Sequence, residues 1–291
     1  MNRLLDPTRY RMALVRWARR SSSPLSRPVA ALLDPERPGS GALLLAAMLL
    51  VAASWLFLGV LQDVVAGDPL VQADQAVFAF LQQWRTASAD RILVAVTGMG
   101  SGGVMVPLVA CVAGWLAWRR CWRTMGYWLA NAVVGETLVQ VVKLGLGRHR
   151  PRLLYEGIEQ FSFPSGHVTV STVVLGFLAV LLARGQPSPR KAGLAATAAI
   201  YVLLVSFSRL YLGAHWLSDA IGGIALGTAW VAFIAMSYEP RASREDYAPA
   251  ALAGVALAAL VVSGTGWLAW QGPGDRQFYA LLPAAARIRA G

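Results

Sequence analysis

The sequence predicts an all-α, polytopic membrane helical bundle, with six spans as its core and a seventh span near the C-terminus. Of the 291 residues, 56% are hydrophobic and only 14% are charged, whereas a soluble domain of this size carries about 25% charged residues. The mean hydropathy is +0.52. Seven apolar runs of membrane-spanning length alternate with charged loops.

Residues 1–40 form a basic arm that contains eight arginines and no lysine. Proline and serine clusters at 21–28 predict irregular structure, while residues 10–20 are compatible both with a helix on anionic lipid and with a solvated tail. The first apolar run, 41–61, contains no charge and is long enough to span. Because a long polar arm precedes it, we interpret this run as an anchor rather than a cleaved signal peptide.

The segment 62–91 is polar and precedes the second span. Within it Val77, Phe78 and Leu81 recur at helical spacing, which predicts a short interfacial helix that either connects two spans or covers a site. The second span, 92–118, is interrupted by the glycine-rich stretch 97–103 and is therefore expected to bend or to start late.

The third span, 124–142, carries unusual polar side chains. Glu136, Gln140 and Lys143 are spaced so that they share one helical face. Because polar groups inside a span usually face the bundle interior, we expect this face to point inward and to support a site.

Four further spans follow the third one. They are expected at residues 168–183, 192–207, 221–236 and 250–270. A charged loop, 238–247, separates the last two.

Basic residues predict the orientation. The arm and the loops at 119–123, 184–191 and 239–245 contain 16 lysines and arginines, which by the positive-inside rule places the N-terminus in the cytoplasm. This pattern also explains the net charge of +11 without a nucleic-acid partner. Three polar islands, at 143–151, 164–167 and 208–219, would then share the opposite face of the membrane.

The first two islands combine fixed cations with a helix start. Lys143 and Arg150 offer a point charge and a planar fork for phosphate oxygens, although a basic collar at the membrane surface would look similar. Ser165, Gly166 and His167 stand where a helix begins, and unpaired N–H groups at a helix N-terminus suit a phosphate.

The third island places His215 and Asp219 four residues apart, so that both face the same way on a helix. An aspartate that accepts from one imidazole nitrogen orients the other nitrogen as a nucleophile. A helix-surface His–Asp pair without a chemical role is the alternative.

These islands resemble the tripartite signature of the type 2 phosphatidic acid phosphatase superfamily. The matching positions, all filled and in order, are Lys143-x6-Arg150-Pro151, Pro164-Ser165-Gly166-His167 and Ser208-Arg209-x5-His215-x3-Asp219. The resemblance implies a six-span lipid phosphatase domain at 41–237, preceded by the arm 1–40 and followed by a loop, seventh span and tail at 238–291.

The resemblance also implies roles for these residues. His215 would attack phosphorus to give a phosphohistidine, Asp219 would hold its tautomer, and His167 would protonate the leaving oxygen. Phosphate binding would fall to the set Lys143, Arg150, Ser165, Gly166 and Arg209. Three cations make a metal dispensable, and the sequence has no acidic cluster suited to magnesium, so we expect no cofactor.

The predicted function is therefore a membrane lipid phosphatase acting on the periplasmic or exterior side of a bacterial-type inner membrane. Its partners would be membrane lipids and a lipid phosphate or diphosphate substrate. Undecaprenyl diphosphate is the first choice, because in bacteria that carrier must be dephosphorylated on this side of the membrane, and phosphatidic acid or phosphatidylglycerol phosphate follows. Arg148 and Arg152 add cations beside the motif, which also favours a diphosphate. A lipid phosphotransferase would use the same residues. A transporter or scaffold with intramembrane polar residues is the alternative from another class.

Overall fold

In a computed structural model of the chain, residues 7–20, 34, 39–67, 69–152, 157–238 and 245–280 are described. They form eleven α-helices and one 3-10 helix. In chain order these are α1 (Pro7–Arg20), α3 (Ser40–Ala66), α4 (Pro69–Gln83), α5 (Ala87–Met99), α6 (Gly102–Trp118), α7 (Trp122–Leu146), η1 (Gly157–Gln160), α8 (Gly166–Ala183), α9 (Ser188–Tyr211), α10 (Leu217–Tyr238), α11 (Pro249–Trp270) and α12 (Gly272–Phe278).

Seven candidate membrane spans are found among the described residues, with α5 and α6 together counted as one. This confirms the all-α membrane fold and each of the seven expected spans. The helices run a few residues beyond the apolar runs, as α9 does in reaching Tyr211. The division of the chain at residues 40 and 237 stays a prediction.

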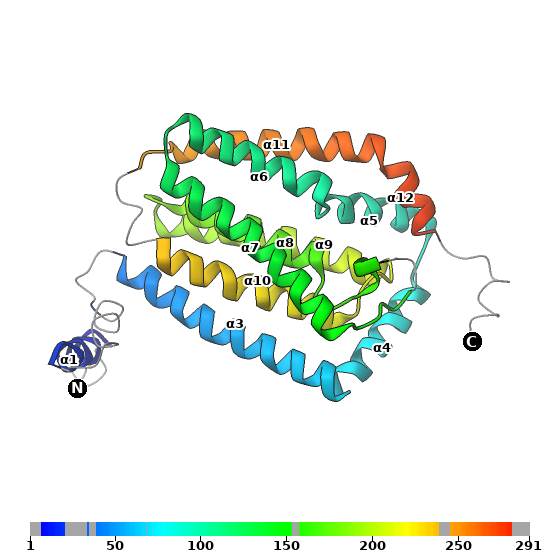
Figure 1. Cartoon of the computed structure of the whole chain (residues 1–291), viewed down its shortest axis with the longest axis horizontal. Helices are drawn as coiled ribbons and strands as arrows, with labels where there is room; N and C mark the ends of the chain where they lie inside the picture. Colours follow the sequence, from blue (N-terminus) through cyan, green and yellow to red (C-terminus); the bar gives the residue numbers. More distant parts are fainter. Residues whose placement is uncertain are drawn as a thin grey trace.

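The spans are arranged around α8, which is the most buried of them. Figure 1 shows α3 running beside α10 along one side of the bundle and α6 beside α11 along the other, with α7 crossing in front. The short helices α4, α5 and α12 gather at one end, on the right of Figure 1. Helix α1 lies near the opposite end of the bundle.

The glycine-rich stretch interrupts the second span as expected. The break falls at Gly100 and Ser101, between the end of α5 and the start of α6. A Cβ on Gly103 would overlap the indole ring of Trp267, and one on Gly100 would lie 2.7 Å from Cγ1 of Val205. Glycine is therefore required here because α11 and α9 pack directly against the backbone of the break.

Helix α7 buries one stripe of side chains, and its composition corrects one prediction. The buried positions Trp128, Asn131, Gly135, Val139 and Lys143 recur at helical spacing and face the bundle. The residue after Gly135, Glu136, is rotated by about 100° on the helix and is exposed.

The expectation of an inward-facing stripe is therefore wrong for Glu136, which is exposed, whereas Gln140 is half-buried and Lys143 is buried. Gln140 Nε2 donates a hydrogen bond to Glu136 on the outer surface of the helix, which confirms their common face. Packing of Gly135 against Val173 of α8 decides which face is buried.

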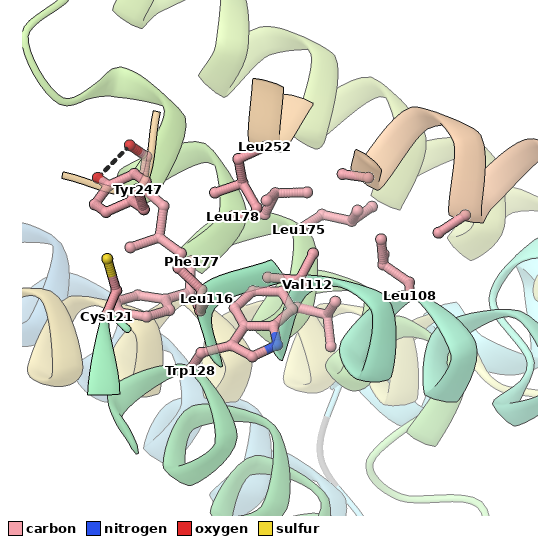
Figure 2. Close-up of a cluster of buried hydrophobic side chains, with 14 of the residues drawn as sticks. Leu108, Val112, Leu116, Cys121, Trp128, Leu175, Phe177, Leu178, Tyr247 and Leu252 are labelled. Carbon is pink, nitrogen blue, oxygen red and sulfur yellow. Dashed lines mark hydrogen bonds between the residues drawn. The ribbon is translucent and has the colours of Figure 1, made fainter. Parts of the chain in front are cut away.

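A large apolar core fills the end of the bundle that is remote from α4 and α12. Figure 2 shows Trp128 beside Phe177, whose ring centroids lie 6.4 Å apart. Polar atoms within this core are paired, because Trp128 Nε1 donates to Val109 O and the Tyr247 hydroxyl donates to Leu181 O. The core fixes the spans relative to one another and leaves the other end for polar side chains.

The close packing of α7 on α8 gives a stability prediction. A Cβ on Gly135 would lie 2.8 Å from Val173 Cγ1, so we expect Gly135→Ala to lower the free energy of unfolding by about 1–3 kcal/mol. The measurement is the apparent melting temperature of the purified protein in detergent. Replacing Val173 by Ala in the same variant should restore it.

Gly126 is the matched control, because it also lies on α7 but a Cβ added there would have no heavy atom within 4 Å. Gly126→Ala should melt no lower than the natural protein, since alanine favours a helix by about 1 kcal/mol over glycine. Equal melting temperatures for the two alanine variants would contradict the packing argument.

Candidate active site

All three polar islands lie at the same end of the bundle. The first island begins in the last turn of α7, the second lies at the start of α8, and the third joins α9 to α10. Contacts between the islands confirm their proximity, since Arg150 Nη1 lies 2.7 Å from His215 Nε2 and Ser165 N donates to Asp219 O at 3.1 Å. Residues distant in sequence thus meet in one polar cluster.

His215 and Asp219 form a buried pair in the turn that starts α10. His215 Nδ1 lies 3.2 Å from Asp219 Oδ2, and the same oxygen accepts from Trp216 N at 2.9 Å. The contact has the predicted four-residue spacing, although His215 precedes the first helical residue, Leu217. Gly213 makes the turn with a φ of +70°, a conformation that favours glycine.

Arg150 defines the tautomer of His215. A guanidinium only donates, so His215 Nε2 accepts from Arg150 Nη1 and the ring proton sits on Nδ1, where Asp219 accepts it. Burial, followed by the positive charges of Arg150, Arg209 and Lys143, holds the pKa of His215 well below its usual range. His215 is therefore neutral at neutral pH and carries on Nε2 the lone pair that a nucleophile needs, here hydrogen-bonded to Arg150.

Two of the predicted cations are bridged by a carboxylate that the sequence did not reveal. Lys143 Nζ donates to Glu159 Oε2 at 3.0 Å, and Arg150 Nη2 donates to the same oxygen at 3.3 Å. Lys143 is buried, whereas the Glu159 side chain is 51% exposed. An exposed anion that bridges two buried cations occupies the kind of position that a phosphoryl oxygen would take.

The second island presents one buried polar atom that has no hydrogen-bond partner among the described residues. Ser165 precedes the first residue of α8, and its buried Oγ has no hydrogen-bond partner within the described part of the chain. Gly166 lies beside Lys143, because a Cβ there would be 3.9 Å from Nζ. His167 is partly buried and lies within electrostatic range of Arg209, Arg150 and Lys143.

Arg209 lies in the last turn of α9 and is buried. Its Nη1 donates to Thr97 Oγ1 at 3.2 Å and to Tyr279 Oη at 2.7 Å. Neither partner was predicted from the sequence. Thr97 lies in the stretch whose glycines indicate only a break, and Tyr279 follows the seventh span, where the motifs gave no signal.

Asp219 is also held by Arg148, which pairs at the same time with a second carboxylate, Asp74. Arg148 Nη1 donates to Asp219 Oδ1 at 2.9 Å, and its Nη2 donates to Asp74 Oδ2 at 2.7 Å. Asp74 also accepts from Ser218 N and Ser218 Oγ, at 2.8 and 2.6 Å. Asp74, on α4, therefore holds both Arg148 and the first turn of α10.

This pairing corrects the expectation that Arg148 favours a diphosphate. Its charge is matched by Asp74 and Asp219, so it stabilises the site rather than adding a cation for substrate. A signal for Asp74 was present in the sequence, because Asp74 shares a helical face with Val77, Phe78 and Leu81. An acidic residue on an apolar stripe indicates a buried partner.

The structure thus places all eight predicted site residues at one end of the bundle. Within the described ranges, no group of three or more His, Cys, Asp or Glu side chains is arranged to hold a metal ion. The arrangement offers a neutral imidazole nitrogen, three cations and a helix start around one volume. Such a set can bind a phosphoryl group and stabilise its transition state.

Comparisons with known proteins agree with this class of site. The family model described as the PAP2 superfamily matches residues 124–243. The chain is 29% identical over 181 residues to phosphatidylglycerophosphatase B of Bacillus subtilis (strain 168), covering 60% of this chain and 87% of that protein. It is 27% identical over 193 residues to undecaprenyl-diphosphatase of Sulfolobus acidocaldarius, covering 64% and 87%.

A solved structure agrees as well. The crystal structure of a transmembrane PAP2 type phosphatidylglycerolphosphate phosphatase from Bacillus subtilis matches with a TM-score of 0.57 and 28% identity, covering 66% of this chain and 98% of that chain. The fold and the polar site define an integral membrane protein built to handle lipid phosphates. Residues 124–243 of the chain match the PAP2 superfamily, and the chain is similar to membrane lipid phosphatases of the PAP2 type.

The contacts of Asp74 give a prediction for Asp74→Asn. The amide keeps the shape of the side chain but loses the charge that holds Arg148, so we expect kcat for phosphate release from a lipid phosphate to fall by about tenfold with little change in KM. A Michaelis–Menten analysis in detergent micelles, with the melting temperature recorded in parallel, checks this.

Asp63→Asn is the control, since the Asp63 side chain makes no hydrogen bond or ion pair with any residue that the structure describes. It should behave as the natural protein does. If Asp74→Asn kept the full kcat, the proposed support of Asp219 through Arg148 would be wrong.

Proposed function

We propose that this chain hydrolyses the terminal phosphoryl group of membrane lipid phosphates through a phosphohistidine at His215. One observation carries the proposal: His215 Nε2 accepts from Arg150 while Nδ1 is held by Asp219, so a neutral nitrogen lone pair faces the cations. Both partners of the imidazole are buried, which fixes the ring before substrate arrives.

The first chemical step follows from this arrangement. A phosphoryl oxygen replaces Glu159 between Lys143 and Arg150, and phosphorus takes the place next to Nε2 that Arg150 Nη1 occupies in the structure. Nε2 then attacks, the bond from phosphorus to the lipid oxygen breaks, and His167 donates a proton to that oxygen. The three cations stabilise the charge on the five-coordinate state.

The second step releases phosphate. His167, having lost its proton, accepts one from water as the water attacks the phosphohistidine. The N–P bond breaks, inorganic phosphate leaves, and His215 returns to its neutral form. A phosphotransferase would pass the same phosphoryl group to a lipid hydroxyl instead, and the products distinguish the two: free phosphate or a new phospholipid.

Phosphatidylglycerophosphate is our first candidate substrate, with undecaprenyl diphosphate second. The names of the relatives in Bacillus subtilis and Sulfolobus acidocaldarius support one substrate each. Because Arg148 is paired with carboxylates, it no longer supports a diphosphate. Arg152, the other arginine of that argument, donates to the backbone oxygens of Leu212 and Ala280. Both lipids present a terminal phosphoryl group, so the mechanism is the same for either.

We also propose that the site faces the periplasm or the exterior, with the N-terminus in the cytoplasm. Basic loop residues at the opposite end, such as Arg119 and Arg184, support this orientation. The transporter alternative loses its main support, because Glu136 lies on the outer surface of α7 and not along a path through the bundle.

Replacing the nucleophile tests the proposal directly. We expect His215→Ala to lower phosphate release from lipid phosphates by more than about a thousandfold while the protein remains folded. The assay uses purified protein in detergent with a chelator of divalent cations and a panel of phosphatidylglycerophosphate, phosphatidic acid and undecaprenyl diphosphate.

His149→Ala is the matched control, because His149 is exposed and its ring contacts Phe161 rather than a proposed site residue. Its backbone oxygen, which accepts from Trp216 Nε1, is kept in the variant. It should keep activity within about twofold, as expected for a surface substitution. Undiminished phosphate release by His215→Ala would overturn the assignment of the nucleophile. Absence of release from every lipid by the natural protein would overturn the proposed function itself.

The depressed pKa of His215 gives a prediction for the pH dependence. A group with a lowered pKa stays neutral to a lower pH, so the loss of activity from protonation of His215 should lie below pH 6.5. Arg150→Gln removes the charge with the largest electrostatic effect on His215, and should therefore move this loss upward toward about pH 6.5.

The measurement compares how kcat/KM depends on pH in the natural protein and in Arg150→Gln, with the same substrate. Titration of the phosphate substrate, with a pKa of about 6, is common to both profiles and cancels in their ratio. A ratio that does not change with pH would contradict the assigned effect of Arg150.

A further inference from the structure

The C-terminal segment after the seventh span returns to the active site. Helix α12 follows α11 directly and lies at the end of the bundle that holds α4 and α5 (Figure 1). It ends at Phe278, and Tyr279 comes next. This segment lies outside residues 124–243, which the family model matches.

Tyr279 contacts Arg209 in two ways. Its hydroxyl oxygen accepts from Arg209 Nη1 at 2.7 Å, and the guanidinium carbon lies 5.9 Å from the centroid of its ring. The same Nη1 also donates to Thr97 Oγ1. Both acceptors are hydroxyl oxygens, so these two contacts orient the guanidinium through hydrogen bonds.

The position of Tyr279 is itself fixed by the fold. Arg85 Nη2 donates to Tyr279 O at 2.6 Å, and Arg85 is held by two hydrogen bonds to Asp90 at 3.0 and 2.8 Å. The Tyr279 ring is buried in a cluster with Leu212 and Ala214, the latter immediately before His215. The hydroxyl is thus held by contacts that do not depend on Arg209.

We propose that Tyr279 is a positioning residue for Arg209, so that α12 completes the phosphate-binding site of this chain. The inference rests on the proposed function, in which Arg209 binds the phosphoryl group. An arginine fork stabilises a transition state only when its donors already point to the oxygens as charge develops. Tyr279 supplies this orientation from outside the three motifs.

Tyr279→Phe tests the role of the hydroxyl alone. The ring stays in its cluster and the backbone oxygen keeps its bond to Arg85, so α12 should remain in place. We expect kcat/KM on a lipid phosphate to fall by about tenfold, mainly through kcat, because a hydrogen bond to a charged group is lost. The inhibition constant of inorganic phosphate should rise in parallel.

Tyr247→Phe is the matched control, because it removes another buried tyrosine hydroxyl, one that donates to Leu181 O at the opposite end of the bundle. It should leave kcat/KM and phosphate inhibition unchanged even if it lowers the melting temperature. Unchanged kcat/KM in folded Tyr279→Phe would overturn the inference.

A double-mutant cycle separates positioning from a general structural effect. In the Arg209→Lys background the fork is absent, so Tyr279→Phe should cost less activity than it does in the natural protein. Equal losses in both backgrounds would contradict the inference. Should Tyr279→Phe melt below the assay temperature, Thr97→Ala replaces it in the cycle, because Thr97 accepts from the same nitrogen.

Failure of the proposed function gives a different result. If the natural protein released no phosphate and His215→Ala made no difference, the function would be wrong whatever Tyr279 does. If the natural protein were active, His215→Ala inactive and Tyr279→Phe fully active, only the inference about Tyr279 would fail.

Discussion

The buried carboxylate of Asp219 and its backbone are contacted by each of the three polar islands. Arg148 of the first island donates to Oδ1, His215 of the third island lies against Oδ2, and Ser165 of the second donates its backbone N–H to the Asp219 carbonyl. A carboxylate buried without such partners would destabilise the fold by several kcal/mol. The need to satisfy this one residue therefore brings the ends of α7, α8 and α9 to the first turn of α10.

The same requirement extends outward to α4. Asp74, Arg148, Asp219 and His215 form a row of alternating groups in which each member is hydrogen-bonded to the next. Asp74 also accepts from Ser218 in the first turn of α10. Both ends of the row are therefore attached to the start of the same helix. Helix α4, which the sequence suggested as a connector or a lid, thus helps to fix the orientation of His215, the proposed nucleophile, through Asp74. The apolar core at the other end of the bundle leaves this polar row undisturbed.

The seven spans could be predicted because apolar runs and charged loops are visible in the local composition. The site residues could be predicted because the three motifs occur in a specific order along the chain. Partners set by tertiary packing could not. The shared face of Glu136 and Gln140 was predicted correctly, but the face that points inward depends on the fit of Gly135 against α8, which no local pattern records. Tyr279 reaches Arg209 across 70 residues of sequence. Only the path of α11 and α12 brings the two together.

The path of α11 and α12 has a consequence for the order in which contacts form during synthesis. Trp267 of α11 packs against the backbone where the second span breaks, and Tyr279 then reaches the end of α9. Helices early in the sequence thus receive contacts from elements that are synthesised after them. The contacts of Arg209 with Tyr279 can form only after α11 and α12 have been synthesised, so that they are absent while the first six spans are being made.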